Sequence, residues 1–384
     1  MRRFSRVLVV GLLGLVCASA PFLFAGGQNE KGSAPAVSTS TAGDQATVQA
    51  AAQANQQRTG PQTKWSGPTS GPKAVPGKKI IYVTNDSRNA LQVVWGKAME
   101  EAAAKIGWTV TTLDGQGTVN GWTAAFSQAI ASKPDGIVTA CDAASIQGPM
   151  TDAFNRKIPV IGLHASANPG PDQALHLWDN ITSSGEEIGK ALADYIIADS
   201  NGKGRAIILY DAQYAIAKLK AEAMKKEFAT CASCTLLDYV NSPLAEVTTQ
   251  MPQLAASWVS RFGTPFYVMT IADYYYDFLV PALRAGGVKP QDAKLIGADG
   301  TPKAYDRVRN GDFQVATVPE PPGLQGYQAI DEMNRALNGA PPSSFVPPVY
   351  VVTKDNIDKE GGSQNTFDPS NNYKTEYAKI WGVQ

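Results

Sequence analysis

Short apolar runs rich in β-branched residues alternate with longer amphipathic stretches from about residue 77 onward. The first runs predict four strands separated by three helices. The predicted strands are Ile80–Thr84, Thr109–Leu113, Gly136–Ala140 and Val160–Leu163, and the helices are Val93–Ile106, Trp122–Ala131 and Ile146–Asn155. This alternation indicates a parallel sheet with crossover helices.

A second set of the same kind follows. Its strands are Ala206–Tyr210, Thr235–Tyr239, Pro265–Ile271 and Leu295–Ala298, and its helices are Glu186–Ala198, Ile216–Phe228, Glu246–Phe262 and Tyr275–Ala285. Two such sets favour two separate lobes over a single sheet of eight or more strands. With 384 residues, the chain is long enough for two cores. We therefore predict an α/β protein with two Rossmann-like lobes and a cleft between them.

The segment after Tyr350 is loop-rich and ends in a short predicted helix, Tyr373–Ile380. Tyr373, Tyr377 and Trp381 recur at helical spacing, which indicates that this helix docks onto one lobe.

The N-terminus has the pattern of an export signal. Arg2, Arg3 and Arg6 precede an apolar run too short to span a membrane comfortably, and small residues follow. We expect residues 1–25 to be a signal peptide cleaved after Ala25. Cys17 leaves a lipid anchor as an alternative, although Val16 before it fits a lipidation motif poorly.

Residues 26–76 contain mainly Gln, Ala, Ser, Thr, Gly and Pro, so we expect a disordered, low-complexity linker.

The chain contains 34 Lys+Arg and 34 Asp+Glu, without a concentrated basic face, so a nucleic-acid partner is not expected. No second apolar stretch of spanning length occurs, which places the mature chain outside the cytoplasmic membrane, soluble or attached at its N-terminus.

The cysteines and histidines favour structural roles. Cys231 and Cys234 follow a predicted helix and precede a strand, so we interpret them as a disulfide formed after export and not as a redox motif. Cys141 and His164 end successive strands, but no third group completes a nucleophilic site. The spacing of Cys and His residues predicts no metal site and no cofactor. Gly115, Gly117 and Gly121 match a dinucleotide fingerprint only weakly.

Several short motifs together resemble one family. They are "KPDGIV" (residues 133–138), "KIPVIGL" (157–163), "GADGTP" (297–302) and "VATV" (315–318). In this order and spacing they are similar to the ribose/galactose-type periplasmic sugar-binding proteins of ABC importers. The resemblance implies the type I periplasmic binding protein fold, in which three crossing segments join two lobes that close on a ligand.

On this chain, the resemblance implies an N-terminal lobe of residues 77–179 plus 321–352. The C-terminal lobe would be residues 180–320 plus 353–384. The crossings would then fall near Asp179-Asn180, Glu320-Pro321 and Val352-Thr353.

The resemblance also implies ligand-binding positions at strand ends. In the N-terminal lobe they are Asn89, Leu91, Gln92, Cys141, Asp142 and His164; in the C-terminal lobe and hinge they are Lys220 (or Lys218), Asp273, Asp299 and Glu320. Carboxylates and amides suit polyols because each makes several hydrogen bonds, whereas C–H groups need a flat apolar face. We expect Trp178 to supply that face.

The expected function is that of a non-enzymatic, monomeric substrate-binding protein that passes a sugar or sugar-like ligand to an ABC permease. A binding protein for a chemoreceptor or sensor kinase is an alternative, and an exported hydrolase using Cys141 or Asp142 is another. Relatives carry two aromatic residues where this chain has Leu91 and Gln92, and an Asp-Arg pair where it has His164. A nucleoside, inositol, amino sugar, amino-acid-like ligand or short oligosaccharide therefore stays open.

Overall fold

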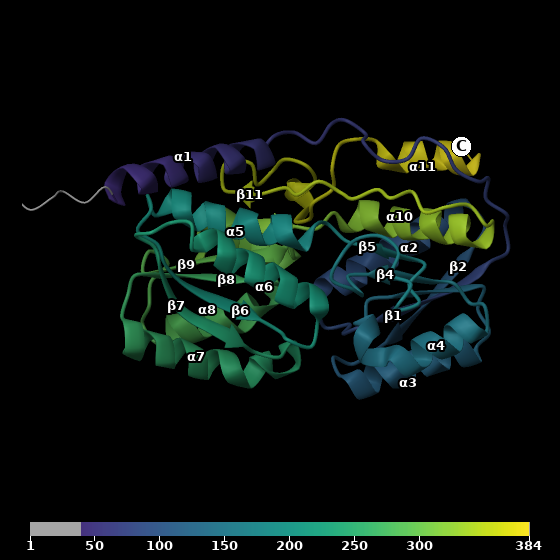
Figure 1. Ribbon diagram of the computed structural model, residues 1–384, viewed down its shortest axis with the longest axis horizontal. Coiled ribbons are helices and arrows are strands. Elements are labelled where there is room, and N and C mark those ends of the chain that lie inside the picture. Colours follow the sequence, from purple (N-terminus) through teal and green to yellow (C-terminus); the bar gives the residue numbers. More distant parts are fainter. Residues whose placement is uncertain (1–39, 384) are drawn as a thin grey trace, which may run out of the picture. The chain divides into compact units, whose positions relative to one another are not determined.

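The computed structural model describes residues 40–383. The predicted signal peptide, Cys17 and the first part of the predicted linker lie outside these residues. Within the described range, no helix is both long and apolar enough to cross a membrane. Two largely parallel sheets, each covered by helices on both faces, confirm the predicted α/β class and the type I fold (Figure 1).

The first sheet has five parallel strands in the order β2-β1-β3-β4-β5. The strands are β1 (Lys79–Thr84), β2 (Thr109–Asp114), β3 (Gly136–Thr139), β4 (Val160–Leu163) and β5 (Asp179–Ile181). Its helices are α2 (Ala90–Lys105), α3 (Val119–Ala131), η1 (Ala143–Ile146), α4 (Gln147–Asn155) and α10 (Pro322–Leu337). The helices α2 and α10 pack together on one face, and α3 and α4 cover the other (Figure 1).

The second sheet has the strand order β11-β10-β9-β8-β6-β7, and only β11 is antiparallel. The strands are β6 (Arg205–Tyr210), β7 (Thr235–Asn241), β8 (Phe266–Thr270), β9 (Ala293–Asp299), β10 (Gln314–Pro319) and β11 (Val352–Thr353). Its helices are α5 (Gly185–Asp199), α6 (Ala215–Phe228), η2 (Leu244–Glu246), α7 (Val247–Phe262), η3 (Asp273–Tyr275), α8 (Tyr276–Ala285) and α9 (Pro302–Asn310).

Local sequence explains where several helices begin. Asn89 accepts a hydrogen bond from the backbone N–H of Leu91 at the start of α2, and Ser184 does the same for Glu187 in α5. Thr301 caps α9, whose first residue is the proline of the "GADGTP" motif. Side-chain oxygens at these positions satisfy N–H groups that have no partner within the helix. The caps therefore begin helices directly after strands, where the loops face the cleft.

The disorder predicted for residues 26–76 is wrong for residues 40–76, which are ordered and pack against both lobes. Helix α1 (Ser40–Arg58) packs on α5, and the Arg58 guanidinium lies 2.7 Å from the Asp194 carboxylate. Farther along, the ring of Trp65 contacts that of Tyr377 with centroids 5.3 Å apart. The segment has few large apolar residues, yet it gains order from an ion pair and an aromatic contact supplied by distant parts of the chain.

The C-terminal tail also differs from the predicted lobe division. Residues Ile357 and Phe367 pack with Tyr305 of the C-terminal lobe, as expected. The last helix, α11 (Tyr373–Trp381), instead packs against α10 of the N-terminal lobe. The tail thus crosses back between lobes. Its predicted helix and its predicted docking through the aromatic residues are confirmed.

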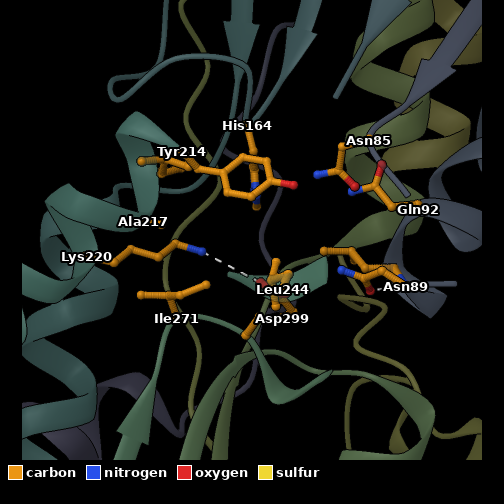
Figure 2. A pocket seen from close by; sticks show the side chains of 13 residues that line it. Asn85, Asn89, Gln92, His164, Tyr214, Ala217, Lys220, Leu244, Ile271 and Asp299 are labelled. Atoms are coloured by element: carbon orange, nitrogen blue, oxygen red, sulfur yellow. Dashed lines mark hydrogen bonds and ion pairs between the residues drawn. The ribbon is translucent and has the colours of Figure 1, made fainter. Parts of the chain in front are cut away.

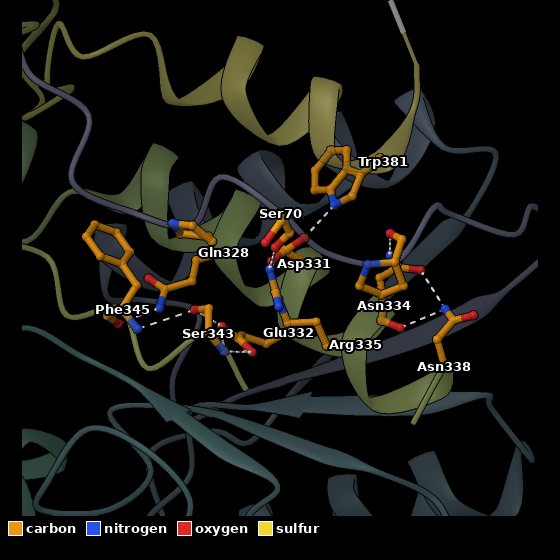
Figure 3. A network of polar contacts seen from close by, with 12 residues as sticks. Ser70, Gln328, Asp331, Glu332, Asn334, Arg335, Asn338, Ser343, Phe345 and Trp381 are labelled. Atoms are coloured by element: carbon orange, nitrogen blue, oxygen red, sulfur yellow. Dashed lines mark hydrogen bonds and ion pairs between the residues drawn. The ribbon is translucent and has the colours of Figure 1, made fainter. Parts of the chain in front are cut away.

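Helix α10 is buried on nearly every side although it carries many polar residues. Figure 3 shows how they are paired. The carboxylate of Asp331 accepts hydrogen bonds from Arg335 Nε at 2.7 Å and from Trp381 Nε1 at 2.8 Å. Arg335 also donates to the backbone oxygen of Ser70, at 2.6 Å. Residues 59–76 and α11 therefore cover a polar helix face by satisfying its hydrogen bonds, as burial requires.

Glu332, on the same helix, should make stability fall with rising pH. Burial raises the pKa of Glu332 to about 8, and the charge of Asp179 adds to the rise. Since the unfolded side chain ionises near pH 4.5, the folded chain binds more protons between about pH 4.5 and 8. Between pH 5 and pH 8 the wild type should lose about 3 kcal/mol more unfolding free energy than Glu332→Gln.

Urea unfolding at both pH values measures this difference. Glu100→Gln, at an exposed position on α2, is the matched control and should follow the wild type. Parallel pH profiles for Glu332→Gln and the wild type would show that Glu332 does not hold a proton in the folded state.

Candidate functional site

A cavity lies at the strand ends where the two lobes meet (Figure 2). The centre of a water molecule can move within about 50 Å³ of this cavity, several times the volume that one bound water requires by the same measure. The lining residues come from both lobes: Asn85, Asn89, Leu91, Gln92, His164, Tyr214, Ile216, Ala217, Lys220, Leu244, Ile271, Ala272 and Asp299. This position at the carboxyl ends of parallel strands is where open α/β sheets bind ligands.

Four ionisable groups form a cluster at the cavity. Lys220 Nζ lies 3.6 Å from Asp299 Oδ1 and 3.9 Å from Glu320 Oε1. His164 Nε2 lies 3.2 Å from the same Glu320 oxygen. Lys220, Asp299 and Glu320 are all at most 5% exposed, so their charges are compensated mainly by one another.

The two carboxyl groups respond differently to this environment. Burial raises the pKa of Asp299, and the opposing effects of Lys220 and His164 do not fully offset it. Burial alone would also raise the pKa of Glu320, but His164, Lys220 and a hydrogen bond from Ser183 outweigh it and lower the pKa to about 2. Glu320 is therefore the more acidic of the two carboxyl groups, and burial makes Asp299 easier to protonate.

Glu320 stands behind the cavity lining and joins two crossing segments. Its Oε2 accepts hydrogen bonds from Ser183 Oγ and Gln325 Nε2, each at 2.7 Å. Ser183 lies between β5 of the first sheet and α5 of the other lobe, and Glu320 lies between β10 of the second sheet and α10. The predicted ligand contact at Glu320 stays a prediction, since in this structure the residue positions His164 and the hinge.

His164 and Asp299 have left-handed backbone conformations, with φ of +57° and +87°. Such conformations are uncommon for residues other than glycine and concentrate at functional sites. Gly300 follows Asp299 with φ of +69°, and a Cβ there would lie 2.3 Å from Pro319 Cβ. The "GADG" turn thus requires glycine at its last position in order to direct Asp299 toward the cavity.

Three amide side chains line the N-terminal side of the cavity (Figure 2). The Asn89 oxygen caps α2 at 3.0 Å from Leu91 N, and the Gln92 oxygen accepts from Tyr82 OH at 2.8 Å. Each oxygen is therefore engaged, and the NH₂ group is the part that can donate to a ligand. The third amide, Asn85, was not predicted, although it belongs to the polar loop after β1.

Apolar side chains supply most of the remaining wall: Leu91, Ile216, Ala217, Leu244, Ile271 and Ala272. Tyr214 adds an aromatic ring at the start of α6. Apart from Leu91, these residues were not predicted from the sequence. Their position in the sequence could have indicated them, because Tyr214 and Ile271 closely follow β6 and β8, as the predicted residues follow other strands.

Cys141 and Asp142 do not line the cavity, contrary to the predicted ligand contacts. The Cys141 side chain is fully buried, and its sulfur lies 3.5 Å from the backbone oxygen of Thr84. Burial raises the pKa of Cys141 to about 12, so the thiol stays protonated at neutral pH. Asp142 accepts hydrogen bonds from Ser145 N and Ala215 N. Both residues follow β3, but their side chains are used in packing and capping.

Trp178 and Asp273 are also absent from the lining. Trp178 packs at the edge of the N-terminal core. Asp273 is fully buried and accepts hydrogen bonds from Gly300 N at 2.9 Å and Thr317 Oγ1 at 2.7 Å. Asp273 therefore supports the turn that carries Asp299. The ring of Tyr214 lines the cavity and that of Trp178 does not, so the predicted apolar face from Trp178 stays a prediction.

The disulfide between Cys231 and Cys234 is confirmed. Across residues 40–383, no group of three or more His, Cys, Asp or Glu side chains is arranged to hold a metal ion.

Comparison with known proteins identifies the family. Residues 80–341 match the family model described as a periplasmic binding protein domain. The chain belongs to the periplasmic binding protein domain family. A search of the curated proteins gave no match.

Solved members of similar fold are ABC transporter solute-binding proteins. One from Agrobacterium vitis with bound allitol has 20% identity and a TM-score of 0.63, over 74% of this chain and 98% of its own. Another from Agrobacterium vitis, with bound α-D-tagatopyranose, has 17% identity and a TM-score of 0.69, over 76% and 99%. The Caulobacter myo-inositol binding protein has 20% identity and a TM-score of 0.64, over 74% and 97%. These similarities show a shared fold.

Proposed function

We propose that this periplasmic binding protein is the extracytoplasmic substrate-binding component of an ABC importer, and that it binds an uncharged sugar or polyol in the cavity between its lobes. Ligand contacts from both lobes would favour the closed arrangement, which is then presented to a permease. The family is extracytoplasmic, and the disulfide between Cys231 and Cys234 suits an oxidising compartment.

The observation that carries the proposal is the pairing of charges inside the cavity. Lys220 already faces Asp299 and Glu320, so a charged ligand would find no unpaired partner. A hydroxyl group can instead accept from Lys220 and donate to Asp299 at once, while the amides of Asn85, Asn89 and Gln92 donate from the other lobe. The solved proteins of similar fold with bound allitol, tagatopyranose and myo-inositol support the same ligand class.

Catalysis is not part of the proposal. The Cys141 thiol is buried with a pKa of about 12, and Asp142 is engaged by backbone N–H groups. Neither has the exposure or activation that a nucleophile needs.

A thermal-shift screen of the purified chain tests the ligand class. The panel comprises hexoses, pentoses, inositols, linear polyols, nucleosides and amino acids. A ligand at about 1,000 times its Kd stabilises by about 4 kcal/mol, which raises Tm by several degrees. We expect a shift with one subclass of sugars or polyols. A response confined to nucleosides or amino acids would overturn the ligand class, and no response at all would overturn the cavity as a sugar site.

A further inference from the structure

Asp142 forms hydrogen bonds to both lobes at once. It ends the loop after β3 in the N-terminal lobe and begins η1. Its Oδ1 accepts from Ser145 N and Ser145 Oγ of the same lobe, each at 3.0 Å. Its Oδ2 accepts from the backbone N–H of Ala215 in the C-terminal lobe, at 2.8 Å. One carboxylate therefore caps two helices that belong to different lobes.

Helix α6 has no side-chain cap of its own. It begins after Tyr214, whose side chain makes no capping hydrogen bond. The first N–H groups of a helix lack partners within it and favour a nearby negative charge. Asp142 meets that need from across the cleft. Because α6 also carries Ala217 and Lys220 into the cavity, the bond holds the N-terminal lobe against a ligand-facing helix.

An aromatic contact reinforces the same junction. The rings of Trp122, on α3, and Tyr214 lie with centroids 5.2 Å apart. Trp122 is fully buried and donates from Nε1 to the backbone oxygen of Asn85 at 2.9 Å. This contact again joins the two lobes beside the cavity. Both contacts require the lobes to meet.

We infer that Asp142, together with the Trp122–Tyr214 pair, forms an interlobe latch that raises ligand affinity by stabilising the closed cleft without touching the ligand. The inference rests on the proposed function, in which closure traps a sugar or polyol. When only the closed state binds tightly, the apparent Kd is the intrinsic Kd divided by the closed fraction. Loss of the latch therefore raises the apparent Kd by the same factor by which the closed fraction falls.

Asp142→Ser separates the two caps of this side chain. A serine hydroxyl still caps η1 in its own lobe, but it is shorter and has no second oxygen for Ala215. Loss of the interlobe cap should weaken binding roughly five- to tenfold and speed dissociation. The matched control is Asp172→Ser in the same lobe, where the carboxylate accepts from Leu175 N within its own loop. That variant should retain wild-type affinity.

Two measurements test the latch. Isothermal titration of each full-length protein with myo-inositol, allitol and D-tagatose gives affinity, and hydrogen exchange of the ligand-free proteins reports protection of the Ala215 amide. We expect weaker binding and faster Ala215 exchange in Asp142→Ser. Equal affinity for a polyol that the wild type binds, or unchanged Ala215 exchange, would overturn the latch. If the wild type binds none of these polyols, the proposed ligand class fails, while the exchange measurement still decides the latch.

Discussion

Replacing Lys220 with methionine should reduce ligand affinity by at least about 100-fold and the unfolding free energy by about 3 kcal/mol. Methionine keeps the apolar stem that packs in the wall but removes the ammonium group. Lys220 is 2% exposed and lies within 4 Å of the Asp299 and Glu320 carboxylates. Without it, two carboxylates share a buried site with much of their compensating charge removed.

The stability loss should depend on pH. Burial already raises the pKa of Asp299, and removal of Lys220 should raise it further because the ammonium opposes that rise. A carboxyl with a raised folded pKa contributes stability at acidic pH that is lost as pH rises through that pKa. The deficit of Lys220→Met should therefore be larger at pH 8 than at pH 5.

Lys218→Met provides the matched control on the same helix. Lys218 is exposed, whereas Lys220 is buried, so the same substitution should leave affinity and stability near wild type. Titration with the polyols of the preceding experiment and urea unfolding followed by circular dichroism measure both quantities. If Lys220→Met matched Lys218→Met in both, Lys220 would not be the partner of the buried carboxylates.

The order of strands and helices could be predicted because the central strands of a parallel sheet are buried on both faces. Such strands are continuous apolar runs, as in β1 and β8. Strand β5 gave no such signal, since its residues Asp179, Asn180 and Ile181 are mostly polar. It forms by pairing with β4 at the sheet edge, where Asn180 Oδ1 also accepts from Ala165 N. That strand depends on tertiary contacts that composition does not report.

The ordered segment before β1 shows the same limit. Its Ala- and Gln-rich helix α1 is compatible with helix propensity, but most helical stability in proteins comes from tertiary packing and not from propensity. Order comes from Arg58 meeting Asp194 and from Val351 N donating to Arg58 O. These partners lie more than a hundred residues away in the sequence. The composition of the segment does not reveal them, and its low hydrophobicity by itself predicted disorder.

Strand ends indicated where the site would be, but not which side chains point into it. Asp142 and Asp273 follow strands of the two sheets and Asp299 ends one, and of these three only Asp299 lines the cavity. The backbone decides the difference, because Asp299 adopts φ of +87°. Asp273 instead turns inward to bond Gly300. A carboxylate that supports a turn and one that faces the cavity have the same sequence signature.

Trp381→Ala should lower the unfolding free energy of the N-terminal lobe by about 4 kcal/mol. The Trp381 side chain is 1% exposed and stacks on Tyr327 with centroids 5.8 Å apart. Its Nε1 also donates to Asp331, so truncation both opens a cavity and leaves a buried carboxylate with one hydrogen bond fewer. The effect would place the end of the chain among the main stabilising contacts of that lobe.

Trp381→Phe divides this effect into packing and hydrogen bonding. Phenylalanine retains most of the ring contact with Tyr327 but cannot donate to Asp331, so a loss of about 1–3 kcal/mol is expected. Phe154→Ala, at a site in the same lobe that is 59% exposed, should change stability by less than about 0.5 kcal/mol. Urea unfolding followed by far-ultraviolet circular dichroism measures all three. A Trp381→Ala protein as stable as Phe154→Ala would mean that α11 does not dock on α10, and that the polar face of α10 is exposed to water.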